Sequence, residues 1–435
     1  MKERGINPYA LASVVIISVL LFASVEPWAF FVPGSFVLVL FFISAGRRPG
    51  IFSIWDIGSS SGWKKLMVFS MAGFFAISLI QVLPLPVPLL KALSPSKHAF
   101  FERMGMEGPR AFSLYPYESL NETVRTALYA MLFFMAVQVG GKRRDLMKVL
   151  YALAFFGFLL SIFAIIQKAA WNGKLYWFRE LAGGSNPFGP FMNRNHFAGF
   201  TGMIIPPAMG LALDAKRIER ALFFIFLSLV MTLALFYSLS RGGIMSFSAS
   251  VLVLSFLSAK GKYGGRRLIY IILFLAGLGL FFLNLGISPV IERFARDGVS
   301  DSGRFLIWEG SLAAFRDFWP FGTGCGTFRF IFPVYNPGMQ AECLYAHNDY
   351  LQALVETGVA GGLFLLLFII SLLIFLLRSF SSGVPSYFQA GLAGSLAYIS
   401  VHSFFDFNLH IPSNAFAFAL ILGLLTGSAE EGPAK

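Results

Sequence analysis

Long apolar runs separated by short polar segments fill the chain from beginning to end. A helix needs about 20 apolar residues to cross the roughly 30 Å hydrocarbon core of a bilayer. The runs predict an all-α integral membrane protein with about twelve transmembrane helices, which form a single polytopic domain over residues 1–435. We expect the spans at 8–25, 28–45, 65–83, 123–140, 147–167, 196–213, 220–239, 242–259, 268–286, 350–377, 386–406 and 412–428.

The charges between the runs predict the topology. More than half of the 34 lysines and arginines lie in one alternating set of loops, and cationic loops stay in the cytoplasm. This bias places both termini in the cytoplasm. Lys2 and Arg4 precede the first run as they would in a signal peptide, but the run is long and further spans follow, so we interpret it as an uncleaved first span.

Composition narrows the class further. Of the 435 residues, 57% are hydrophobic and only 13% are charged, about half the share of a soluble protein. These values exclude disordered, collagen-like and disulfide-scaffold proteins and argue against a water-soluble enzyme. The net charge of +12 comes without a soluble basic face for nucleic acid. Two cysteines, Cys325 and Cys343, are too few for a metal or redox framework, and either a disulfide or two free thiols is possible.

Three outer loops are long, at 84–122, 168–195 and 287–349. Loops of such length are usually functional. We expect the last, between spans nine and ten, to be a long periplasmic loop with short helices, one of them running from about 302 to 318. The glycine-rich segment 321–328 resembles a nucleotide-binding loop, but it follows no strand and lies outside the cytoplasm, so we interpret it as a turn.

Two arginines stand out on the outer side. Arg241 lies in the Ser-Arg-Gly-Gly turn at 240–243, at or slightly inside the membrane surface. An arginine at membrane depth costs about 2.5–3.5 kcal/mol on insertion scales and needs an anionic partner. Arg304 lies near the N-terminus of the expected loop helix, which itself favours anions. The pair could bind a diphosphate; alternatively, Arg241 snorkels to the interface and Arg304 forms a salt bridge with Glu309 or Asp301.

His347 lies at the outer end of span ten, followed by Asn348, Gln352 and Glu356 at a spacing of four. This spacing puts the three polar side chains on one helical face, and a polar stripe that enters the membrane usually lines a cavity. An imidazole can take a proton from a hydroxyl near neutral pH. His347 is therefore a candidate general base, with a structural hydrogen-bonding role as the alternative.

Two further polar clusters are expected on the same side. Arg194 and His196 open span six, and His402 and Asp406, four residues apart, end span eleven. Interhelical hydrogen bonding would explain either cluster alone. All of these motifs project to one face of the membrane, which favours a common site.

Together the motifs resemble the O-antigen ligase and polymerase superfamily of bacterial envelope enzymes. The resemblance rests on six segments over roughly half of the chain, in this order: 193–198, 240–243, 303–308, 322–328, 347–358 and 406–412. The first half of the chain resembles the family only in hydropathy and in the proline-rich loop at 84–86.

The resemblance implies a GT-C type fold and a metal-independent, inverting glycosyltransferase without a cofactor, in the bacterial inner membrane with its active site facing the periplasm. It implies a glycan on undecaprenyl diphosphate as donor and lipid A–core or another glycan as acceptor. By the same resemblance, Arg241 and Arg304 bind the diphosphate and His347 is catalytic. From their positions, the following are accessory candidates: Arg194, His196, Asn348, Glu356, His402 and Asp406.

Three functions remain open at this point. The first is ligation of whole O-antigen to lipid A–core, and the second is an O-antigen or exopolysaccharide polymerase that uses the same donor. The third is a transporter of lipid-linked glycan, which would place its polar residues near the bilayer midplane. The polar residues here cluster at one surface, which favours a transferase.

Overall fold

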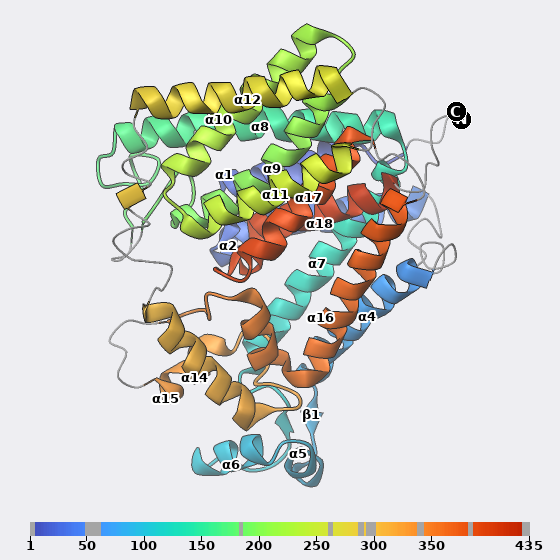
Figure 1. Ribbon diagram of the computed structural model, residues 1–435. Coiled ribbons are helices and arrows are strands. Elements are labelled where there is room, and N and C mark those ends of the chain that lie inside the picture. Colours follow the sequence, from blue (N-terminus) through green and yellow to red (C-terminus); the bar gives the residue numbers. More distant parts are fainter. Residues whose placement is uncertain are drawn as a thin grey trace.

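The computed structural model describes residues 5–47, 62–181, 186–259, 264–285, 291–292, 302–336, 343–381 and 386–428, and most of them are helical (Figure 1). The N-terminal elements, in chain order, are α1 (Pro8–Leu20), η1 (Phe22–Ser24), α2 (Pro27–Arg47), α4 (Gly62–Val82), β1 (Pro84–Leu85), α5 (Val87–Leu93), α6 (Pro95–Arg103), β2 (Arg110–Ala111), α7 (Pro116–Gly140) and α8 (Arg143–Ala169). The strands β1 and β2 pair antiparallel.

The second half contains the segments that carry the motifs. Its elements are α9 (Arg194–Asp214), α10 (Ile218–Tyr237), α11 (Arg241–Ala259), α12 (Gly264–Leu285), α14 (Ser302–Phe318), α15 (Phe328–Tyr335), α16 (Asp349–Ser381), α17 (Tyr387–His402), η2 (Asn408–His410) and α18 (Pro412–Ser428). The expected loop helix coincides with α14. Cys325 and Cys343 are both free thiols.

Every predicted span coincides with a helix. Among the described residues, eight helices are long and apolar enough to cross a membrane, namely α2, α4, α7, α8, α9, α10, α11 and α16. The four other predicted spans coincide with α1, α12 and α18, whose apolar stretches are shorter, and with α17, which has 16 residues. The helices therefore indicate a multi-pass membrane protein, and twelve crossings remain a prediction.

Small residues let the central helices approach closely. A Cβ added at Gly391 on α17 would stand 2.5 Å from the carbonyl oxygen of Pro206 on α9. Between α7 and α18, a Cβ at Gly423 would stand 2.5 Å from the carbonyl oxygen of Phe133. Such contacts are typical of helix packing in membranes, where close backbone approach replaces the hydrophobic driving force. They hold α9, α17 and α18 in the middle of the bundle.

Helix α16 is broken at Gly358, whose φ of +65° is left-handed. The break frees backbone carbonyls, and the loop 320–328 enters to bind them. The amide N–H of Thr323 donates to the Val355 carbonyl at 2.9 Å, and Gly324 donates to the Glu356 carbonyl at 2.9 Å. Backbone groups at membrane depth must be satisfied within the protein. The glycine-rich segment is thus an irregular turn packed against α16, as the sequence predicted.

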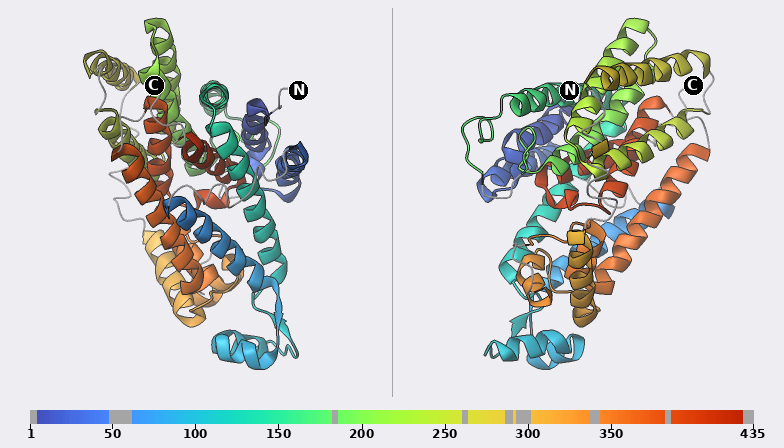
Figure 2. Two further views of the ribbon diagram at one scale, coloured as in Figure 1. Left: turned by 90° about the vertical axis from the view of Figure 1, so that its right-hand side faces the viewer. Right: turned by 60° about the vertical axis from the view of Figure 1, so that its left-hand side comes forward.

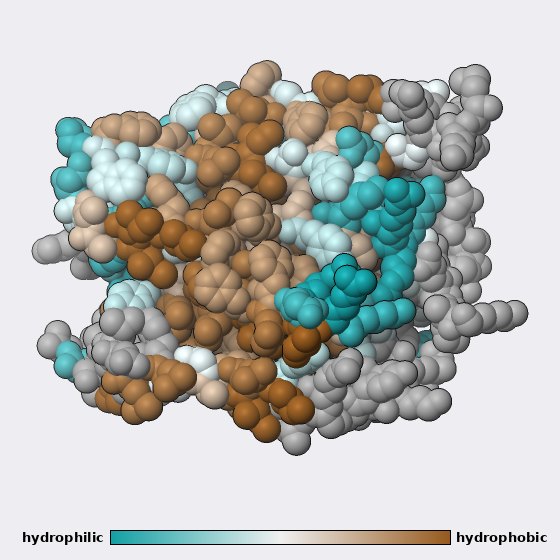
Figure 3. All heavy atoms as spheres, turned by 90° about the horizontal axis from the view of Figure 1, so that it is seen from above, coloured by the Kyte–Doolittle hydropathy of each residue, from teal (hydrophilic) through white to brown (hydrophobic). Residues whose placement is uncertain are grey.

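The molecule has two parts in all views. A bundle contains α1, α2, α8–α12, α17 and α18, whereas α5, α6, α14 and α15 lie away from it, beyond the tilted helices α4, α7 and α16 (Figures 1 and 2). The face at the top of Figure 1 is a broad hydrophobic surface with hydrophilic residues gathered toward its edges (Figure 3). Such a surface fits contact with lipid.

Candidate active site

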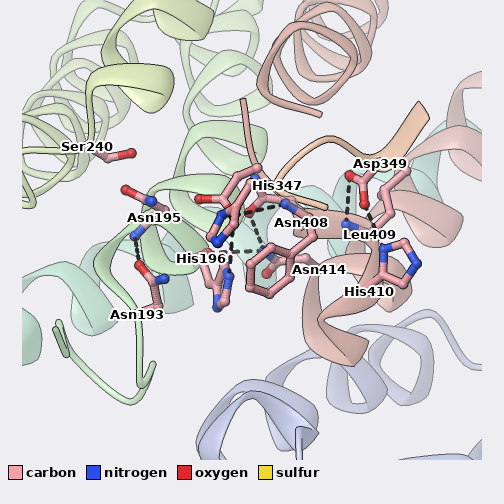
Figure 4. A network of polar contacts seen from close by, with 12 residues as sticks. Asn193, Asn195, His196, Ser240, His347, Asp349, Asn408, Leu409, His410 and Asn414 are labelled. Carbon is pink, nitrogen blue, oxygen red and sulfur yellow. Dashed lines mark hydrogen bonds and ion pairs between the residues drawn. The ribbon is translucent and has the colours of Figure 1, made fainter. Parts of the chain in front are cut away.

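Asp349, the first residue of α16, holds together the two loops that form the site. Its Oδ2 accepts from Ser403 Oγ at 2.7 Å and from the Leu409 amide at 3.2 Å, and its Oδ1 lies 2.8 Å from His410 Nδ1. Its own amide donates to the Ser403 carbonyl at 2.9 Å. These bonds fix the segment between α17 and α18 against the start of α16 (Figure 4).

The contact with Asp349 determines the charge state of His410. Burial alone would lower the pKa of His410, but its hydrogen bond to Asp349 and the charge of that carboxylate outweigh burial and raise the pKa to about 9. The imidazole is therefore protonated at neutral pH, and the loop is held by an ion pair. Asp349 and His410 were not predicted as site residues, although both lie in polar motifs of the sequence.

Asp406 lies at the centre of the site with only 1% of its side chain exposed. Its Oδ1 lies 3.3 Å from Nδ1 of His347 and 3.8 Å from Nε2 of His196. It also accepts from the amide of Phe407 at 2.9 Å. Burial would raise the pKa of Asp406, but the facing His347, His196 and Arg304 outweigh it and lower the pKa well below the ordinary value. The carboxylate is therefore ionised at neutral pH.

Phe407 positions the two imidazoles beside the carboxylate. Its ring meets His196 at a centroid distance of 4.7 Å and His347 at 4.8 Å, both edge to face, and it stacks on Tyr345 at 4.2 Å. His347 has a left-handed φ of +50°, a conformation that is uncommon outside glycine and clusters at functional sites. Its side chain remains 28% exposed, so one side of the imidazole is open to a substrate.

His402 ends α17 and is buried beside the first turn of α11. A Cβ added at Gly242 would stand 3.1 Å from Cδ2 of His402, so only glycine allows this approach without displacement. Arg241, the residue before Gly242, therefore begins α11 next to the cluster. The expected span 386–406 runs past the end of α17, and Asp406 accordingly lies in the turn after the helix.

Arg304 lies in the first turn of α14. It is near enough that its charge contributes to the low pKa of Asp406. Arg194 is the first residue of α9, where its amide donates to the Asn186 carbonyl at 2.7 Å. Both are half-buried.

The predicted polar stripe on α16 is bonded to backbone amides. Asn348 Oδ1 accepts from the Leu351 amide at 3.0 Å and caps the helix. Glu356 is buried, and its carboxylate accepts from the amides of Gly326 at 2.8 Å and Phe328 at 3.2 Å. These contacts favour structural roles for both residues, because their side-chain acceptors are engaged by the backbone.

Polar atoms without a partner concentrate at this site. Eleven buried side-chain nitrogen or oxygen atoms among the described residues lack a hydrogen bond, and five of them cluster here: His196 Nε2, His402 Nδ1, Asp406 Oδ2, Asn408 Nδ2 and His347 Nδ1. His347 Nδ1 faces Asp406 Oδ1 at 3.3 Å as an ion-pair contact, without hydrogen-bond alignment. Buried polar groups are almost always satisfied in folded proteins, so such a cluster indicates a place for a polar ligand. No group of three or more His, Cys, Asp or Glu within the described ranges has metal-binding geometry.

Asn408 and Asn414 complete the cluster. Neither was predicted from the sequence as a site residue. Asn414 Nδ2 donates to the His196 carbonyl and to Asn408 Oδ1, both at 3.1 Å. Asn408 packs against Gly199 on α9. These bonds join α9 to α18 behind the imidazoles (Figure 4). The sequence signal for them was the presence of Asn408 and Asn414 on either side of Pro412, where the last apolar run begins.

A family model described as O-antigen ligase matches residues 226–366, roughly a third of the chain. The match runs from α10 into α16 and includes Arg241, Arg304 and His347. A search of curated proteins found no match. The family match confirms, for this segment, the resemblance to the O-antigen ligase and polymerase superfamily that the motifs carry.

Proposed function

We propose that the chain is a glycosyltransferase that moves a glycan from undecaprenyl diphosphate to a sugar hydroxyl, with ligation of O-antigen to lipid A–core as the reaction. We place it in the bacterial inner membrane, with the site facing the periplasm and both termini in the cytoplasm. The observation that carries the proposal is the pairing of His347, which lies within the family match, with the buried Asp406 among unpartnered polar atoms.

The pairing supports His347 as a general base. With the Asp406 carboxylate 3.3 Å from Nδ1, the favoured tautomer carries its proton on Nδ1 and leaves Nε2 free to accept one. Nε2 then takes the proton of the acceptor hydroxyl, whose oxygen attacks the anomeric carbon from the face opposite the diphosphate. The bond from that carbon to the diphosphate oxygen breaks, its electrons leave with the diphosphate, and the anomeric configuration inverts.

Arg241 and Arg304 are proposed to hold the leaving diphosphate. A guanidinium binds phosphate oxygens through paired, charge-assisted hydrogen bonds, and charge that develops on the leaving group is stabilised most by cations already in place. Each arginine lies in the first turn of its helix, where the unpaired amides also favour an anion. We propose a metal-independent reaction because two guanidinium groups can supply this stabilisation.

Transfer by the purified protein in nanodiscs tests the proposal, with lipid-linked glycan, lipid A–core and no added metal or ATP. His347→Ala should lower turnover by about 10³-fold, within the usual range for general base catalysis, and leave donor binding intact. His98→Ala is the matched control, because His98 lies on α6 beside Glu102. An active His347→Ala variant would remove the catalytic role, and loss of activity with a chelator would overturn metal independence.

A polymerase would use the same residues, so a deletion in the native host separates the two. Accumulation of long-chain glycan on its carrier lipid would support ligation. Accumulation of single repeat units would instead make the protein a polymerase. Both outcomes are consistent with the superfamily match.

A further inference from the structure

A cavity of about 510 Å³ lies between α9, α10, α11 and α12. Its wall is almost entirely apolar and includes Met209, Ile225, Phe247 and Phe274, one from each helix. The polar members of the wall are hydroxyl side chains. A dry void costs free energy in proportion to its volume, so a cavity of this size within a bilayer is expected to hold hydrocarbon.

The cavity extends away from the proposed active site, because its wall runs along α11 from Phe247, five residues after Gly242, to Ser258. Helix α11 begins at the site, where Gly242 approaches His402, and the far end of the cavity is marked by Ser258 on the same helix. Ser258 follows Gly242 by sixteen residues along the helix, which corresponds to about 24 Å at about 1.5 Å per residue. Leu213, at the end of α9, also lines the cavity at the end that the topology places at the cytoplasmic surface.

Two hydroxyls at that end have no partner. Ser258 Oγ and the Tyr270 hydroxyl are buried without a hydrogen bond, and both residues line the cavity. Other serines of the wall are satisfied, since Ser228 donates to the Phe224 carbonyl at 2.8 Å. A buried hydroxyl without a partner is destabilising, so the pair predicts a ligand with acceptor oxygens at this end of its hydrocarbon.

A cation lies near the same end. Arg217 is exposed and precedes α10 as its N-cap residue, and the same helix supplies Ile225 and Ser228 to the cavity wall. It follows Leu213 by four residues, so their Cα atoms are at most about 15 Å apart. Basic groups beside the ends of transmembrane helices on the cytoplasmic side attract anionic lipid headgroups.

We propose that this cavity binds an anionic phospholipid of the cytoplasmic leaflet. An acyl chain fills the apolar wall, ester carbonyl oxygens accept from Ser258 and Tyr270, and the phosphate pairs with Arg217. An isoprenoid tail carries no acceptor oxygen along its length, so a polyprenyl lipid could accept from these hydroxyls only through its phosphate, whereas a phospholipid offers ester carbonyl oxygens as well. The proposal does not involve the transfer reaction, but it rests on the proposed topology, which assigns this end of the bundle to the cytoplasmic side.

Lipid that stays with the full-length protein through purification in mild detergent tests the proposal, measured by mass spectrometry per mole of chain. Wild type should retain about one phosphatidylglycerol. Ser255→Phe, which fills the cavity, and Arg217→Gln should each lower retention at least fivefold. Tyr151→Phe, on the separate helix α8, is the matched control and should retain lipid as the wild type does.

A double variant, Ser258→Ala with Tyr270→Phe, adds no bulk and decides the question if Ser255→Phe does not fold. It should also lose retention, and phosphatidylglycerol should raise its Tm less than it raises that of wild type. Unchanged retention in the double variant would overturn the proposal. Equal retention of phosphatidylcholine by wild type, or recovery of a polyprenyl lipid in place of phospholipid, would overturn it as well.

Discussion

Replacing Asp406 by asparagine tests the pairing on which the proposed base depends. The change keeps the shape of the side chain and removes the charge 3.3 Å from Nδ1 of His347. An imidazolium forms as the base takes its proton, and the carboxylate stabilises it. At 3.3 Å the attraction is about 5 kcal/mol for an effective dielectric constant of about 20, and about 2.5 kcal/mol for about 40.

The lower value is the better guide, because 28% of the His347 side chain is exposed and solvent screens the pair. About 2.5 kcal/mol corresponds to a fall in kcat of about 70-fold. The loss should appear in kcat rather than in the KM for the donor, since the charge acts on the transition state.

Steady-state transfer in nanodiscs measures both constants. Glu309→Gln, an exposed carboxylate on α14, is the control and should behave as the wild type does. Wild-type kcat in Asp406→Asn would refute the reasoning, and so would a variant that loses only donor affinity.

Three further predictions follow from the site and its supports. Arg241→Ala and Arg304→Ala should each lower kcat/KM for the donor by about 10- to 100-fold, as expected for a lost charge-assisted contact, and unchanged kinetics would remove the phosphate role. Gly358→Ala, at φ +65° where a Cβ would clash with a loop carbonyl, should lower Tm by several degrees, whereas Gly279→Ala, with open space around it, should not. Because the pKa of His410 is raised to about 9, its stabilising contribution is complete below about pH 6.5 and is lost as the pH rises through about 9, so Tm should fall over that window in wild type and change less in His410→Gln.

Hydropathy predicted the helices because the length of an apolar run is a local property. How the ends of helices meet is not local. The spacing of four between Gln352 and Glu356 correctly placed them on one helical face, but it could not show that α16 breaks at Gly358. The break makes room for the loop 320–328, and the amides of Gly326 and Phe328 in this loop donate hydrogen bonds to the Glu356 carboxylate.

The arrangement of the site likewise depends on tertiary contacts that sequence spacing cannot show. Asp406 and His402 were paired by spacing, on the assumption that the helix continued through both. Helix α17 ends at His402, so Asp406 turns toward His347 and His196, which precede it by many residues. The sequence placed all three histidines on one side of the membrane, but the shared carboxylate depends on tertiary contacts made by Asp349.

A structure of the protein with undecaprenyl diphosphate bound, determined by cryo-electron microscopy in nanodiscs, tests the central claim most directly. We predict diphosphate density between the guanidinium groups of Arg241 and Arg304, with the open face of the His347 imidazole directed toward it. Diphosphate bound elsewhere on the bundle, out of reach of these three side chains, would contradict the account.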